Sequence, residues 1–291
     1  MADRVDKSWH EKGLGGYPVE ALVGTLNHYG IAVDEASFRA LAKEHFPLAI
    51  GAKWFREWKG TGKFKDFPFP AADELWRRWL KETLAPNELA IGLLELLRAL
   101  DRIEGKGPKK TPDEAFASVD AMVARGPAEA DARERFMAEV VEAMGQLMRA
   151  FDTAAEALAK RGQAEHATRF VDLEEKLFPV RAGVSRLLVD AVLGKDPDTA
   201  AKLEVLASDD KRDAYARAAA IDALLHLAEG QKASAPLFKL MDEAVAQHDH
   251  DLANVALERL RMLLKALPES SLKDEATVRA QKFVAAFDHH H

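Results

Sequence analysis

Apolar positions recur with a helical period through residues 126–161. These positions are Met137, Val140, Met144, Leu147, Phe151, Ala154 and Leu158. Charged or amide side chains stand on the opposite face: Glu139, Glu142, Gln146, Arg149, Asp152, Glu156 and Lys160. The pattern predicts one continuous helix with a broad apolar stripe, about 50 Å long at roughly 1.5 Å per residue. We expect this to be the central helix of the molecule. Its apolar stripe has two interpretations, packing within one chain and the seam of a dimer.

Shorter amphipathic segments lie on both sides of this stretch, separated by glycine and proline. Helices are predicted at 18–29, 34–45, 50–59, 71–83, 86–102 and 111–125 before it, and at 164–178, 179–194, 196–208, 211–229, 236–247, 251–267 and 272–287 after it. A loop with two glycines and two prolines covers 60–70. Proline, Asp or Thr begins several of these segments, as expected for a first helical turn. The chain is therefore predicted to be all-α.

Leucine pairs give the second half a repeating pattern. They are Leu187-Leu188, Leu224-Leu225 and Leu263-Leu264, and each precedes a breaker, Gly194, Gly230 or Pro268. The interval is about 37 residues, enough for two helices per unit. We predict a helical bundle that leads into an irregular α-hairpin array, similar in spacing to HEAT or TPR repeats. An irregular bundle remains the alternative.

Changes in composition suggest domain boundaries. All five Trp lie in the first 79 residues, and 104–111 has the composition of a linker. We predict an aromatic-rich helical domain at 1–105, then a linker, a helix and the long central helix at 106–178, and the hairpin array at 179–288. The final histidines, 289–291, have the composition of a tag remnant.

Charge and composition narrow the classes of function. The 291 residues carry a formal net charge of −7 and contain no Cys. Cys-based metal sites and thiolate nucleophiles are thereby excluded, and an acidic chain is disfavoured for duplex binding. The start has no secretory pattern and the most apolar run, 89–100, contains charges. We expect a soluble, cytoplasmic protein without a membrane segment.

Catalytic motifs are incomplete wherever they begin. Leu14 stands where a two-histidine zinc motif beginning at His10 needs its second ligand, and Phe64 replaces the Ser/Thr of a phosphate loop. We therefore predict no catalytic residue, no metal and no cofactor, and favour a protein that is not an enzyme.

Two groups of polar residues have a structural and a functional interpretation. Residues 248–251 (His-Asp-His-Asp) offer metal ligands, but we favour a turn in which Asp249 or Asp251 caps the next helix. Asp222 and His226 lie four residues apart on one helical face. That spacing favours a surface hydrogen bond between them over a pocket lining.

Aromatic and basic residues are interleaved between Lys53 and Lys65. In a helical projection the rings of Trp54, Phe55 and Trp58 fall on one side, and the charges of Lys53, Arg56 and Lys59 fall on the other. This segregation favours buried rings. A partner-protein groove edged by the loop 60–70 is the second interpretation, and a site for single-stranded nucleic acid is the third.

The preferred hypothesis is a non-enzymatic helical protein that binds another macromolecule as an adaptor, regulator or inhibitor. Its partner is expected to be a protein, and nucleic acid and membranes are disfavoured. The candidate partner-binding residues are Trp58, Lys59, Lys63, Phe64, Phe67 and Phe69. The alternative is a helical-bundle enzyme or small-molecule or metal-binding protein with a pocket near His28, His45 or His226; single-strand binding through 53–65 comes third. A monomer and a homodimer are both open.

Overall fold

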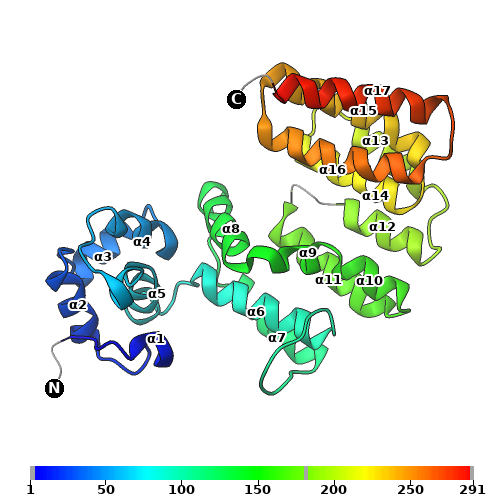
Figure 1. Cartoon of the computed structure of the whole chain (residues 1–291). Helices are drawn as coiled ribbons and strands as arrows, with labels where there is room; N and C mark the ends of the chain where they lie inside the picture. Colours follow the sequence, from blue (N-terminus) through cyan, green and yellow to red (C-terminus); the bar gives the residue numbers. More distant parts are fainter. Residues whose placement is uncertain (1–3, 180–182, 289–291) are drawn as a thin grey trace. The chain divides into compact units, whose positions relative to one another are not determined.

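The computed structural model describes residues 4–179 and 183–288 (Figure 1). Within these ranges every regular element is a helix and there is no strand, so the predicted all-α class is confirmed. The chain divides into two compact units, Met1–Phe151 (unit 1) and Asp152–His291 (unit 2). None of the helices in the described ranges has the length and apolar character that crossing a bilayer requires.

Unit 1 is built from short helices, several of which begin with proline. Its elements are α1 (Trp9–Lys12), α2 (Val19–His28), α3 (Glu35–Leu41), α4 (Pro47–Phe55), η1 (Gly62–Phe64), α5 (Pro68–Trp79), α6 (Pro86–Ala99), α7 (Pro112–Val123), α8 (Ala130–Met144) and η2 (Gly145–Leu147), and α9 (Met148–Asp152) ends it. Proline at the first turn of α4, α5, α6 and α7 needs no N–H there and presets φ. Capping boxes start α3 at Asp34 and α7 at Thr111.

The core of the first 85 residues is aromatic. Phe38, Phe67 and Trp76 are at most 2% exposed, and α5 packs against α2 and α4. Helix α6 packs against α7 and α8. The compact unit therefore continues past the predicted boundary at 105 to residue 151, because α7 and α8 return to α6 instead of starting a new body.

Gly51 allows α4 and α5 to approach closely. A Cβ at this position would lie 2.8 Å from Cδ1 of Phe69 and 2.9 Å from its Cα. Gly to Ala inside a helix normally stabilises by up to about 1 kcal/mol. Here the added methyl group meets backbone, which cannot rotate away, so overpacking decides the sign.

We expect Gly51→Ala to lower the free energy of unfolding by about 1–3 kcal/mol. Urea denaturation followed by Trp fluorescence measures this change, because all five Trp lie in unit 1. Gly92→Ala in α6 is the control: its Cβ meets mainly the flexible end of the Met122 side chain, and we expect it to be tolerated. Equal stability of both variants would show that the α4–α5 contact is not tight.

The predicted central helix is wrong as a continuous element. The stretch 126–161 contains α8, η2, α9 and α10 (Ala154–Lys160). Helix α8 ends because Gly145 has φ 53°, and Thr153 interrupts the next segment. Most of the apolar stripe is nevertheless buried: Met137, Val140, Met144, Phe151 and Leu158 are all at most 7% exposed. Leu147, in η2, is the exception at 39% exposed. The periodicity located most of the buried face and missed the breaks.

Unit 2 consists of successive helix pairs in contact with each other. Its helices after α10 are α11 (Ala164–Leu177), α12 (Val184–Val192), α13 (Thr199–Ser208), α14 (Ala214–His226), α15 (Gly230–Gln247), α16 (His250–Ala266) and α17 (Ser271–Asp288). Contacts run from α10 to α12, α14 and α16 in one row, and from α13 to α15 and α17 in the other (Figure 1). Each helix of a row also packs against its neighbour in sequence.

The leucine pairs all lie in one of these rows, on α12, α14 and α16. Leu224 and Leu263 are fully buried, and Gly194 and Pro268 follow the ends of their helices. Gly230, the third predicted breaker, is instead the first residue of α15. Pro236 lies inside this helix, so the predicted helix 236–247 was too short. This arrangement resembles a repeat, and membership of the HEAT or TPR kind stays a prediction.

Two polar groups can now be placed. Asp249 accepts a hydrogen bond from the backbone N–H of Leu252 at 2.9 Å and caps α16, which confirms the turn interpretation of 248–251. The predicted hydrogen bond between Asp222 and His226 is wrong. His226 Nδ1 lies 2.8 Å from Glu156 Oε2 on α10, and Asp222 instead faces Arg259 on α16 at 3.7 Å.

Candidate binding groove

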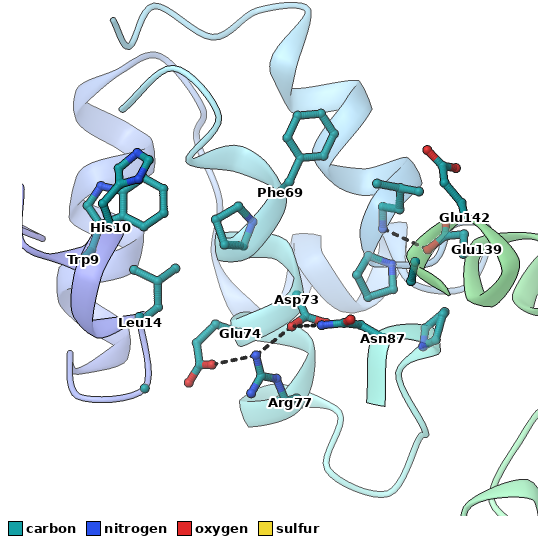
Figure 2. A pocket seen from close by; sticks show the side chains of 17 residues that line it. Trp9, His10, Leu14, Phe69, Asp73, Glu74, Arg77, Asn87, Glu139 and Glu142 are labelled. Carbon is teal, nitrogen blue, oxygen red and sulfur yellow. Dashed lines mark hydrogen bonds and ion pairs between the residues drawn. The ribbon is translucent and has the colours of Figure 1, made fainter. Parts of the chain in front are cut away.

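A groove of about 720 Å³ opens on the surface of unit 1. Its lining residues come from five places in the sequence: Trp9, His10, Gly13, Leu14, Gly15, Pro47, Leu48, Phe69, Pro70, Asp73, Glu74, Arg77, Pro86, Asn87, Glu139, Glu142 and Ala143. Figure 2 shows α1 and its following turn on one side, α5 along the middle, and Glu139 and Glu142 of α8 on the other side. None of His28, His45 and His226 lines it.

Arg78 holds the wall formed by the turn after α1. Its guanidinium donates hydrogen bonds to the backbone carbonyls of Tyr17 (2.6 Å), Gly15 (3.1 Å) and Leu14 (3.2 Å). It also pairs with Glu74 on its own helix at 2.6 Å. A planar guanidinium can satisfy several acceptors at once, so this side chain fixes the turn against α5.

Glu139 joins α8 to the start of α4. Its two carboxylate oxygens accept hydrogen bonds from the backbone N–H groups of Leu48 (2.9 Å) and Ala49 (3.0 Å). These are donors of the first turn of α4, which has no side-chain cap of its own. The rings of Phe46 and Phe136 pack edge to face beside this contact, with centroids 5.3 Å apart. A helix 90 residues away in sequence thus supplies the missing cap.

The pKa of Glu139 is raised by burial. The two backbone N–H donors act in the opposite direction, while the nearby charges of Glu142 and Asp73 raise the pKa further. A carboxylate in this setting experiences repulsion from two others within one groove.

Charge in the groove is distributed unevenly. Arg77 lies 2.7 Å from Asp73 Oδ2 and 3.2 Å from Glu74 Oε2, and Asn87 donates to Asp73 at 3.4 Å (Figure 2). Arg77 and Arg78 therefore both pair with carboxylates of α5. Glu142 on α8 is exposed and makes no hydrogen bond or ion pair with a described residue.

The predicted partner-binding residues separate into three places. Phe64 and Phe67 are 7% and 0% exposed and lie in the core. Trp58 is half-buried beside them: its indole N–H donates to the Phe64 carbonyl at 2.7 Å, and its ring stacks on Phe67 at 5.9 Å. The helical projection that placed Phe55 and Trp58 together does not hold, because α4 ends at Phe55, which is 39% exposed.

The remaining three residues lie outside that cluster. Phe69 is part of the groove and contacts the Phe55 ring at 5.6 Å. It belongs to the first turn of α5, which starts earlier than predicted, at Pro68. Lys59 and Lys63 are exposed. A role of these six residues in binding a partner stays a prediction.

The acidic side of the groove was missed by the sequence analysis. Glu139 and Glu142 counted there only as part of the polar face of the long helix. One feature of the sequence near residues 47–49 could have indicated this contact: helix α4 begins there without a capping side chain of its own. No pattern in the sequence, however, identifies a cap that lies on another helix.

Searches against protein-family models, curated proteins and solved structures found no match to this chain. The fold and the groove alone therefore define the class: an all-helical protein with an open, partly acidic groove in its first unit.

Proposed function

We propose that the chain is a non-enzymatic protein-binding protein and that the groove of unit 1 holds its partner. The observation that carries this proposal is the makeup of the lining: aromatic and proline side chains beside charged ones, in a groove open to solvent. Protein interfaces combine such apolar anchors with a polar rim. Roles as adaptor, regulator or inhibitor all use a surface of this kind.

The polar side chains of the groove support this proposal over a catalytic one. Glu74 pairs with Arg77 and Arg78, and Glu139 caps α4. Each of these carboxylates is held by structural partners and is not aimed at a neighbouring nucleophile. The volume also falls within the range of small-molecule pockets, which makes a metabolite the alternative occupant.

Photocrosslinking in cells of the source organism tests the proposal. A benzophenone amino acid replaces Ala143, which is exposed in the lining of the groove, and in a separate variant it replaces Val205 of α13, which is 68% exposed. We expect one or a few discrete protein adducts from position 143 that do not form from position 205. Adducts that are absent from position 143, or identical at both positions, would count against the groove as a protein-binding surface.

A further inference from the structure

We propose that the groove of unit 1 receives a Lys or Arg side chain from an extended segment of the partner protein, with Glu142 as the carboxylate that contacts the cation. The inference rests on the proposed function and specifies the chemistry of the partner.

Charge complementarity is the first argument. Four carboxylates line the groove, Asp73, Glu74, Glu139 and Glu142, against one guanidinium, Arg77. Arg77 and Arg78 neutralise the α5 side by pairing with Asp73 and Glu74. The unbalanced negative charge therefore belongs to α8, where Glu142 faces solvent without a cation. Partners are selected by complementary potentials of this kind.

The second argument is electrostatic strain inside the groove. Oδ1 of Asp73 is buried and has no hydrogen-bond partner in the structure. Burial is the main cause of the raised pKa of Glu139, and the negative charges of Glu142 and Asp73 raise this pKa further. A cation placed between α5 and α8 would interact favourably with all three carboxylates at once, which an uncharged group cannot do.

The walls fit the remainder of such a segment. Leu48 and Pro70, both partly exposed, offer apolar surface that the aliphatic stem of Lys or Arg can cover while its charged end stays at the carboxylates. The partly exposed ring of Phe69 adds a further contact. A groove of about 720 Å³ is larger than one side chain needs, so adjoining residues of the segment have room as well.

The test uses the full-length protein and a phage library of short random peptides. We expect the enriched peptides to contain Lys or Arg and few acidic residues. A synthetic copy of an enriched peptide should lose about tenfold in affinity when its Arg is replaced by citrulline, which removes the charge and keeps the shape.

Matched variants locate the contact on the protein. Glu142→Lys should weaken the same peptide by about tenfold. Glu134→Lys changes the charge equally on the same helix; Glu134 is exposed and does not line the groove. We expect this control to stay within about twofold of the parent, since screening limits the reach of an exposed charge.

Enriched peptides without basic residues, no enrichment at all, or equal effects of the two variants would each overturn the inference. The proposed function fails separately. A protein crosslinked at position 143 through a neutral or acidic segment would leave the groove a binding surface and refute only the cationic ligand. Without specific crosslinks at that position, both proposals fall.

Discussion

Replacing Phe67 with alanine is expected to lower the free energy of unfolding by about 3–5 kcal/mol. The ring is fully buried and contacts three others, Trp9 at 5.4 Å, Trp58 at 5.9 Å and Phe64 at 5.7 Å. Truncation removes the buried apolar area and leaves a cavity that aromatic neighbours cannot easily fill. Trp fluorescence during urea denaturation measures the loss, because two of these neighbours are Trp.

The same measurement separates the two interpretations of the aromatic segment. A residue that serves mainly to contact a partner would tolerate alanine with little change in stability. Phe55→Ala is the matched control, since this ring is 39% exposed, and we expect a cost of about 1 kcal/mol or less. If Phe67→Ala were as stable as Phe55→Ala, the ring would not be a core residue.

Local patterns in the sequence predicted much of the fold. The proline starts at Pro86 and Pro112 and the Thr111 capping box depend on neighbours within one or two turns, and the structure contains them. The predicted start at Pro236 failed, because this residue lies inside α15. The prediction of a single long helix failed at Gly145. Glycine is tolerated within helices at a modest cost, so the presence of a glycine does not show whether the helix continues or ends there. In the structure Gly145 adopts φ 53° and ends α8.

The groove could not be predicted in the same way. Glu139 acquires its role from Leu48 and Ala49, and Glu142 acquires its role from a groove that α8 lines together with α5. These relations join residues far apart in sequence, and the polar face of an amphipathic helix looks the same whether it meets solvent or caps another helix. Phe69 was singled out from composition, and the burial of Phe64 and Phe67 agrees with the interpretation that the analysis favoured.

Unit 2 contains an acid–base pair with a predictable pH response; its carboxylate is buried and its histidine side chain, His226, is 29% exposed. Glu156, on α10, is 8% exposed and lies 2.8 Å from Nδ1 of His226 on α14. Its pKa is lowered from 4.5 to about 2, first by the hydrogen bond with His226 and then by that with Lys160. The pKa of His226 is raised by Glu156, with a smaller contribution from Asp222, against burial and the charge of Lys160.

Each shift contributes stability in its own pH range. The lowered pKa of Glu156 stabilises the folded protein above about pH 4.5, and this contribution disappears as the pH falls toward 2. The raised pKa of His226 stabilises it below 6.5, its unperturbed value, and this contribution disappears as the pH rises through the folded-state pKa. Both are complete between about pH 4.5 and 6.5, so the pair contributes most there.

Glu156→Gln is therefore expected to destabilise unit 2 near pH 5.5 by about 1–2 kcal/mol, and by much less near pH 2. The loss is smaller than the full equivalent of the pKa shift because solvent screens the partly exposed side chains of His226 and Lys160. His226→Gln should reduce the fall in the free energy of unfolding that the parent protein shows as the pH rises above 6.5, because the group whose deprotonation causes this fall is removed. Hydrogen exchange of the α10 and α14 amides measures both, and Trp fluorescence serves as an internal reference because every Trp lies in unit 1. Glu165→Gln, an exposed position on α11, is the control. The pair joins two helices of the same row, so exchange of the α10 and α14 amides in the parent protein should depend on pH after correction for intrinsic rates. Exchange that does not depend on pH would show that the contact does not hold these helices together.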